Sequence, residues 1–254
     1  NTSTTANLNS NNRSMTFDVS VDNVVFGFDG DDLRILLIRQ GLPGQDMGQE
    51  RFHMAVPGDL VLPEEGLDEA ASRILSNLTS IKGIFLKQFY TFGAPDRVFH
   101  EKDKEWLTKM RRYPDRRVVS VGYYSLVALA DYRPKPNSFA SQVEWCLLSN
   151  IPTLAFDHNA IIDAGLEQLR EDVANRNIIF ELLPEKFTLG QLQRLHEIIL
   201  GKTLDKRNFR KNVKRMADVV ALDEKQAGVL HKPAQLYTIG DKIEVYIQSL
   251  LRNR

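Results

Sequence analysis

The segment formed by residues 57–81 constrains the fold of this chain more than any other. It reads PGDLVLPEEGLDEAASRILSNLTSI, which indicates a turn, an acidic helix start and an amphipathic helix. Acidic residues gather at the expected helix start, where the helix dipole favours negative charge: Glu64, Glu65, Asp68 and Glu69. Apolar residues then recur at helical spacing and predict one buried face, formed by Ala70, Ile74, Leu78 and Ile81.

This segment resembles the Nudix box of pyrophosphate-cleaving enzymes, GX5EX7REUXEEXGU, in which U is a bulky aliphatic residue. If Glu65 takes the place of the first glutamate, Arg73 falls on the arginine, Asp59 on the first glycine and Ser80 on the second. The three metal-ligand positions are then Ile74, Asn77 and Leu78. If the box begins at Gly58 and Glu64 instead, those positions are Arg73, Ser76 and Asn77.

Neither alignment leaves a carboxylate in the second half of the helix. In the Nudix box the carboxylates lie one helical turn apart, so that divalent cations bridge them to a diphosphate. Apolar and amide side chains cannot neutralise such a cation. The segment therefore resembles a Nudix fold without Nudix chemistry, and we expect no catalytic residues, no bound metal and no cofactor.

Charge and composition indicate two unlike parts. The chain has 254 residues, 43% of them hydrophobic, and we expect two domains. The formal net charge is zero, but seven basic residues and one acid lie between positions 201 and 215, so a basic module accompanies an acidic body. The single cysteine, Cys146, excludes an internal disulfide framework. Without a membrane-spanning apolar run or an N-terminal signal pattern, we expect a soluble, cytoplasmic protein.

The first two thirds of the chain read as strands and helices around the box. Residues 1–14 are almost all Asn, Ser and Thr and predict a disordered tail. Apolar runs at 19–28 and 33–39 flank an Asp-Gly turn and predict a β-hairpin. We predict further strands at 52–56, 84–92, 118–128 and VEWCLL, loops at 41–49 and around Pro134 and Pro136, and a helix at 154–171 capped by Asp157. The charged segment 98–116 reads as a short surface helix, a mobile lid or a solvated insertion.

The last third begins with two capped helices. Thr188 opens a helix, with Gln191 three residues on in the capping-box pattern, and Gly201 closes it. Asp205 can cap a second helix after a short turn. A short apolar run at 219–222, a turn around Gly228 and the strand-like LHKPAQLYTI follow. This order predicts a winged helix, which sets its second helix in the DNA major groove and lays the wing along the backbone.

The second helix has two unlike sides. Phe209, Val213 and Met216 cluster on one side, and basic residues occupy the other. Basic side chains neutralise phosphates, and Arg207 or Asn208 near the helix start can reach base edges. The candidate DNA-binding residues are Lys206, Arg207, Asn208, Arg210, Lys211, Lys214, Arg215 and Lys232. The alternative is that the basic face is merely solvated.

The chain as a whole resembles the Nudix-related transcriptional regulators, bacterial proteins with an N-terminal Nudix-like effector domain and a C-terminal winged helix. The matching segments are FGAPDR, RRVVSVGYYSL, LAFDH, FTLGQLQRLHEIILG, DKRNFRKNVKRM and KPAQLY, of which the last three are the more specific. The resemblance implies an α+β chain, a Nudix α/β/α sandwich followed by a winged helix-turn-helix. We place a tail at 1–14, the Nudix-like effector-binding domain at 15–172, a linker at 173–185 and the winged-helix DNA-binding domain at 186–254.

The resemblance also implies a homodimer that binds a palindromic operator in double-stranded DNA and responds to a metabolite in the old substrate cleft. The effector would be an ADP-ribose-like nucleotide or a sugar such as arabinose. Candidate effector-binding residues are Arg39, Asp96, Arg97, Arg117 and Tyr123, for which surface ion pairs and core packing are the alternative roles. We expect His158 to be structural, and Arg73 to pair with Glu64 or Glu65.

Two other functions stay open. The first is a Mg-dependent Nudix hydrolase of the ADP-ribose pyrophosphatase type with a C-terminal dimerisation domain. It would have to hold its metal with the acids of the first helical turn, which the helix dipole explains better. The second is a protein-interaction adaptor, which would bind neither DNA nor a small molecule.

Overall fold

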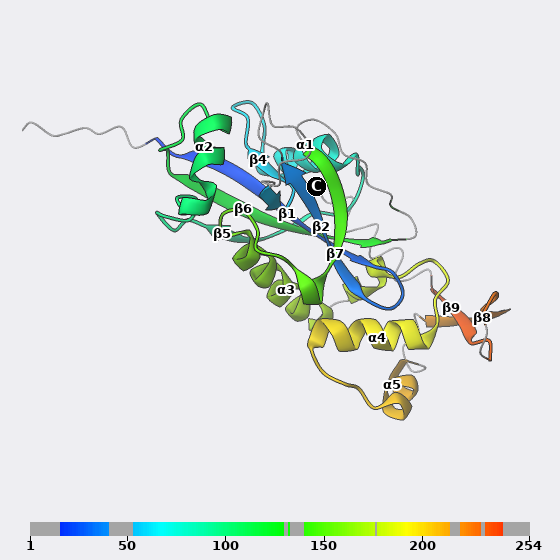
Figure 1. The fold of residues 1–254 in the computed structure, drawn as a ribbon. Helices are drawn as coiled ribbons and strands as arrows, with labels where there is room; N and C mark the ends of the chain where they lie inside the picture. Colours follow the sequence, from blue (N-terminus) through cyan, green and yellow to red (C-terminus); the bar gives the residue numbers. More distant parts are fainter. Residues whose placement is uncertain are drawn as a thin grey trace, which may run out of the picture.

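The structure is a computed structural model that describes residues 16–40, 53–129, 132, 140–175, 177–213, 219–229 and 232–240. The predicted tail at 1–14, the loop at 41–49 and the segment with Pro134 and Pro136 lie outside these ranges. Within them a mixed sheet is covered by helices on both faces and is followed by a helix pair and a β-hairpin (Figure 1). No helix in the described ranges combines the length and apolar character needed to cross a bilayer.

Seven strands form the main sheet: β1 (Asp18–Phe28), β2 (Leu33–Gln40), β3 (His53–Ala55), β4 (Gly58–Leu60), β5 (Lys87–Phe92), β6 (Val118–Ala128) and β7 (Ala140–Leu147). The central order is β3-β2-β1-β6-β5, with β4 paired to β1 and β7 paired to β2. Strands β1 and β6 are parallel, and the other pairs are antiparallel. The predicted hairpin is confirmed, since Asp29 accepts the amide hydrogens of Asp31 and Asp32 and closes the turn between β1 and β2.

Helices lie on both faces of this sheet: α1 (Leu67–Thr79), η1 (Glu101–Asp103), α2 (Lys104–Met110), η2 (Leu148–Asn150), α3 (His158–Asn175) and η3 (Asn177–Leu182). On one face α1 buries the predicted apolar stripe, because Ala70, Ile74, Leu78 and Ile81 are each at most 4% exposed. On the opposite face lie α3 and η3. The predicted α/β/α sandwich is therefore confirmed.

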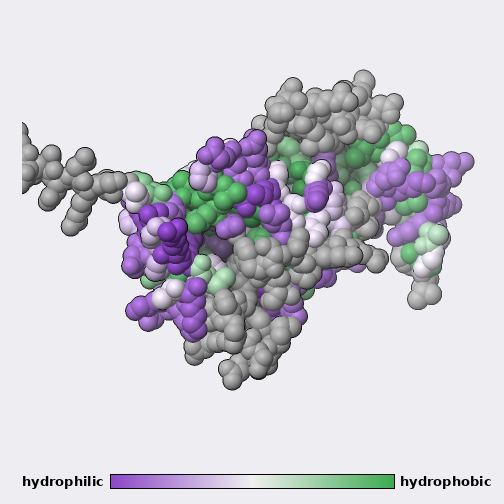
Figure 2. All heavy atoms as spheres, turned by 90° about the horizontal axis from the view of Figure 1, so that it is seen from above, coloured by the Kyte–Doolittle hydropathy of each residue, from purple (hydrophilic) through white to green (hydrophobic). Residues whose placement is uncertain are grey.

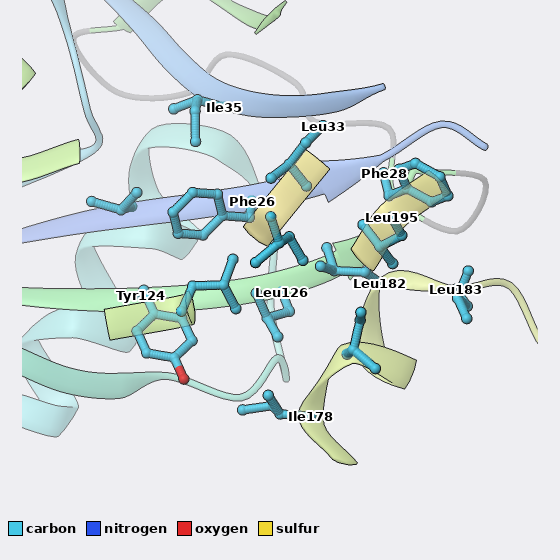
Figure 3. Packing of buried hydrophobic residues seen from close by; sticks show 14 of the residues in the cluster. Phe26, Phe28, Leu33, Ile35, Tyr124, Leu126, Ile178, Leu182, Leu183 and Leu195 are labelled. Carbon is cyan, nitrogen blue, oxygen red and sulfur yellow. The ribbon is translucent and has the colours of Figure 1, made fainter. Parts of the chain in front are cut away.

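The second face carries the larger core. Figure 3 shows side chains of β1, β2 and β6, among them Phe26, Leu33 and Leu126, gathered with Ile178 and Leu182 of η3. Residues 173–185, expected to be a linker, contain the end of α3 and η3, and Ile178, Ile179, Phe180, Leu182 and Leu183 are buried in this core. These residues bury apolar surface against the sheet, as an exposed linker would not. The domain boundaries given above, at residues 172 and 186, stay a prediction.

The last third has the predicted order of elements: α4 (Leu189–Leu200), α5 (Lys206–Val213), β8 (Val219–Lys225) and β9 (Gln235–Ile239). Gly201 ends α4 with φ +64°, a left-handed conformation that glycine adopts without strain. Asp205 accepts the amide hydrogen of Asn208 at 2.8 Å and caps α5 as predicted. Strands β8 and β9 form the antiparallel hairpin expected of a wing.

Helix α4 is fixed to the first part of the chain. Leu192 and Leu195 share the core of Phe28 and Leu33, so the two parts have continuous apolar packing. The Arg194 guanidinium donates to the Asp31 carbonyl oxygen at 3.0 Å, in the β1–β2 turn. At the C-terminal end of α4, Arg170 of α3 donates to the carbonyl oxygen of Ile199 at 2.7 Å, and Figure 1 shows α3 and α4 close together there.

Replacing Thr188 by alanine is expected to lower the free energy of unfolding by about 1 kcal/mol. Thr188 Oγ1 accepts the Gln191 amide hydrogen at 3.1 Å, while the Gln191 side chain accepts the Thr188 amide hydrogen at 2.8 Å. Urea unfolding measures the change, and Thr203→Ala, in the exposed turn before α5, is the control. Equal midpoints for the two variants would show that this capping box contributes nothing.

Candidate functional site

A pocket of about 460 Å³ opens beside the start of β1. Its walls come from β1, from β4 with the residues before it, from Arg97 and Val98, from the segment 106–116, and from Phe156 and His158 at the start of α3. The volume lies within the range of about 300 to 1,000 Å³ that is usual for small-molecule sites. Seen from above, the α2 end of the molecule is mainly hydrophilic, with a smaller hydrophobic area beside it (Figure 2).

A buried ion-pair network forms one wall. Arg97, 4% exposed, donates from Nε and Nη2 to the two carboxylate oxygens of Asp157, at 2.9 and 2.7 Å. Its Nη2 also lies 3.6 Å from Asp22, which accepts a hydrogen bond from the Ser120 hydroxyl. Gly58 passes over Asp22 so closely that a Cβ at position 58 would lie 2.0 Å from the carboxylate, so only glycine fits there without a shift.

His158 completes this wall as a neutral side chain. The backbone N–H of Val56 donates to its Nδ1 at 3.2 Å, which leaves the ring hydrogen on Nε2, 3.6 Å from Asp22. Burial lowers the pKa of His158, and the nearby carboxylates of Asp22 and Asp157 oppose that shift. The ring packs edge-on against Phe156. The expected structural role fits these contacts, although the residue also borders the pocket.

The segment 98–116 forms the opposite wall. Of the roles left open, the structure gives it a short helix, α2, whose Trp106 packs edge-on against Phe156 with ring centroids 5.6 Å apart. The fully buried Asp103 carboxylate accepts the Phe156 amide hydrogen at 2.9 Å. Lys102 donates to the carbonyl oxygens of Leu154 and Phe156. The segment is thus packed against the loop before α3. A solvated insertion would not make these contacts.

This wall presents arginines to the pocket. Arg116 donates to Asp18 at 3.3 Å, and its guanidinium lies 3.8 Å from the Tyr113 ring centroid. The exposed Arg112 lies over the same ring, with its guanidinium carbon 5.3 Å from the centroid. Arg111 is more deeply placed, and burial lowers its pKa. Across the pocket, burial raises the pKa of Asp59, which lies 3.8 Å from Arg73.

Of the predicted effector-binding residues, only Arg97 lines the pocket. Arg39 lies 3.8 Å from Glu144 on the neighbouring strand, and Asp96 is exposed. Arg117 donates to the Gly93 carbonyl oxygen at 2.6 Å, and the Tyr123 hydroxyl donates to Asp68 at 2.6 Å beside α1. The charged and histidine pocket residues missed from the sequence are Asp18, Asp22, Asp59, Arg111, Arg112, Arg116 and His158, of which Asp22 carries a signal because it is a carboxylate in the middle of a strand rich in valine and phenylalanine.

The helix α1 has the geometry of the first alignment to the Nudix box. Glu65 and Arg73 form the bidentate pair expected for Arg73, at 2.6 and 2.7 Å. Ser80 has φ +62°, the left-handed conformation that suits the glycine of the box. Ile74 and Leu78, at two metal-ligand positions, are buried in the core. The described residues contain no cluster of three His, Cys, Asp or Glu side chains that could hold a metal.

The basic surface lies on α5. Lys206, Arg207, Asn208, Arg210 and Lys211 are all exposed, while Val213 is 2% exposed and faces the core. Lys232, before β9, is also exposed. Lys214, Arg215 and Met216 lie outside the described residues. The described basic residues therefore lie on the open side of the helix, where a nucleic acid can reach them.

Comparison with known proteins identifies the family. The chain is 30% identical over 225 residues to the "ADPR responsive transcriptional repressor NtrR" of Acinetobacter baylyi, an alignment that covers 86% of this chain and 80% of that relative. The family model of the NrtR DNA-binding winged helix domain matches residues 179–239. This chain belongs to the NrtR family of transcriptional regulators.

Solved structures agree with the fold of this NrtR-family chain. Shewanella oneidensis NrtR complexed with a 27mer DNA matches with a TM-score of 0.62 and 24% identity, over 87% of this chain and 93% of that one. A MutT/nudix family protein from Enterococcus faecalis matches with a TM-score of 0.63 and 20% identity, over 88% and 86% of the two chains. The predicted combination of a Nudix sandwich and a winged helix is thus confirmed.

Proposed function

We propose that this chain is a DNA-binding transcriptional regulator whose effector is an ADP-ribose-like nucleotide bound in the pocket beside β1. The observation that carries the proposal is the alignment, over most of both chains, with a relative named as an ADPR-responsive repressor. The pocket and the basic face of α5 support the proposal as candidates for the two binding sites that such a regulator needs.

The pocket suits a nucleotide with a diphosphate. Four arginines line it, Arg97, Arg111, Arg112 and Arg116, and the planar guanidinium binds phosphate oxygens in pairs. Its carboxylates, Asp18, Asp22 and Asp59, can accept hydrogen bonds from ribose hydroxyls. A sugar such as arabinose, the other effector class considered, has hydroxyls for the carboxylates but no anionic group for the arginines.

For the DNA side, α5 would lie in the major groove with Arg207 or Asn208 near base edges, while Lys206, Arg210 and Lys211 contact phosphates and Lys232 extends the contact from the wing. Lys214 and Arg215 are proposed on sequence alone. A palindromic operator would be read by a homodimer, one winged helix per half-site. Such a regulator would act in the cytoplasm, where bacterial DNA lies.

We also propose that the chain is not a hydrolase. The metal-ligand positions of the box carry Ile74, Asn77 and Leu78, which offer a divalent cation no carboxylate. Among the acids at the helix start, the Glu65 carboxylate is already held by Arg73 and by the Leu62 amide. Incubation with ADP-ribose and Mg²⁺ should therefore release no AMP. Release that is lost in Glu65→Gln would favour the hydrolase instead.

A saturating ADP-ribose concentration is expected to raise the melting temperature, because a ligand bound only by the folded state stabilises it. At about 100 times the dissociation constant the stabilisation is about 2.7 kcal/mol, which corresponds to about 5 to 11 °C for a chain of this size. Differential scanning fluorimetry with ADP-ribose, NAD precursors and arabinose in parallel measures it. A shift with arabinose and none with ADP-ribose would mean that the effector is a sugar. A shift with neither would contradict the proposal that the pocket binds either effector.

A further inference from the structure

The charged groups around the pocket are unequally paired. Arg97 is held by Asp157 and Asp22, and Arg116 is held by Asp18. Arg111 differs from both, since its Nη1 is buried and has no hydrogen-bond partner among the described residues. Among the described residues that line the pocket, Arg111 therefore has a guanidinium nitrogen that is closed to bulk solvent and makes no hydrogen bond.

A buried guanidinium nitrogen without a hydrogen-bond partner is unusual because arginine does not lose its proton under ordinary conditions. Burial has removed water from Arg111 and lowers its pKa, while Asp18, Asp22 and Asp59 act on it through space without a hydrogen bond. Desolvation of a charge is offset when an opposite charge binds to it. The position is thus suited to an anion that enters from solvent.

The backbone of Arg111 is well fixed for such a role. It caps the C-terminus of α2, and its N–H donates to the Leu107 carbonyl oxygen at 3.0 Å. One turn earlier, Trp106 and Leu107 are buried and anchor the helix against the loop before α3. A residue on this anchored turn can present a guanidinium without first ordering a loop.

We propose that Arg111 binds the diphosphate of the effector directly and takes the place of the divalent cations through which a Nudix hydrolase neutralises its substrate. The inference rests on the proposed nucleotide effector and adds two claims, that Arg111 is a specificity-determining residue and that effector binding needs no metal. A guanidinium matches the geometry of two phosphate oxygens. It also supplies the positive charge that divalent cations supply in a Nudix hydrolase, which the residues at the metal-ligand positions of this box cannot bind.

The carboxylates of the pocket are compatible with an anionic ligand. Asp22 and Asp18 already form ion pairs with Arg97 and Arg116, so they repel an anionic ligand in the pocket less than free carboxylates would. Asp59 lies on β4, on a different wall from the segment that carries Arg111. This separation lets the diphosphate lie against the arginines and the ribose hydroxyls against the carboxylates.

The test is isothermal titration calorimetry on the full chain with ADP-ribose and with adenosine, each in EDTA and in Mg²⁺. Arg111→Gln is expected to weaken ADP-ribose binding by about 10- to 150-fold, the effect of losing a charged hydrogen-bond partner, and to change adenosine binding little. The matched control is Lys104→Gln, which removes one positive charge from an exposed position of α2 outside the pocket and should change ADP-ribose binding by less than about threefold. Wild-type affinity should be the same in EDTA and Mg²⁺.

The outcomes separate the two levels of the proposal. If the wild-type chain does not bind ADP-ribose, the nucleotide effector and the role of Arg111 both fail. If wild type and Arg111→Gln bind equally, or if binding requires Mg²⁺, only the role of Arg111 fails. Should Arg111→Gln not fold, Arg111→Lys keeps the charge without the planar fork, and wild-type affinity in that variant would contradict the bidentate contact.

Discussion

Replacing Arg97 by alanine is expected to lower the free energy of unfolding by about 3 to 5 kcal/mol, the effect of leaving buried charges without their partner. The Arg97 side chain is 3% exposed, and those of Asp22 and Asp157 are 6% and 19% exposed. Without the guanidinium, the two carboxylates would face each other in a poorly hydrated wall of the pocket. Equilibrium unfolding in urea, followed by circular dichroism, measures the loss.

The control for Arg97 is an equally short but accessible ion pair. Arg34 Nε lies 2.6 Å from Asp29, and both side chains are about 30% exposed, so Arg34→Ala should cost about 0 to 1 kcal/mol. A large difference between the two variants would assign the stabilisation to burial. If Arg97→Ala costs no more than Arg34→Ala, water reaches the network and its packing is looser than the contacts indicate.

Replacing both Arg207 and Arg210 by alanine is expected to weaken binding to DNA of the regulated promoter by about 30- to 1,000-fold at moderate salt. One lost base contact accounts for about 1 to 3 kcal/mol of this, and the lost phosphate contact for the remainder. The dependence of log affinity on log salt should also become less steep by about one or two phosphate contacts. Fluorescence anisotropy with a labelled promoter fragment, at several salt concentrations, measures both quantities.

A control variant removes the same charge from the other end of the molecule. Lys104→Ala with Lys109→Ala takes two positive charges from α2, and both side chains are well exposed. Affinity for DNA should stay within about threefold, since exposed charges beyond a Debye length are largely screened. If the α2 double variant and the α5 double variant weaken binding equally, affinity for DNA depends only on net charge. In that case α5 is not the helix that contacts the major groove.

The elements that the sequence predicts well are those with local signals. The box helix, the β1–β2 hairpin and the capping box at Thr188 each depend on residues within one or two turns of each other, and all three are present. The basic face of α5 follows from spacing in the same way. Periodicity and capping act over a few residues, so a single sequence suffices to read them.

The pocket could not be predicted in this way because its parts are far apart in the chain. Asp22 of β1, Arg97 after β5 and Asp157 before α3 meet only when these elements have packed, and nothing local in FGAPDR indicates that Arg97 turns inward. The segment 98–116 looks exposed because it is rich in charge, yet Asp103 is fully buried. Besides Arg97, which was predicted to bind the effector, the Asp22 carboxylate in a largely buried strand is a signal that could have pointed to this site.

The shared core of the sheet and α4 limits how a ligand can act on the DNA-reading part. Leu192 and Leu195 lie among Phe28 and Leu33, so a hinge that swung the helix pair away from the sheet would expose this apolar surface to water. An effector response is therefore expected to leave α4 packed on the sheet. If the chain forms the proposed homodimer, a change in how the two subunits pack would alter the spacing between their α5 helices, and that spacing would then no longer match the spacing of the two half-sites in the operator.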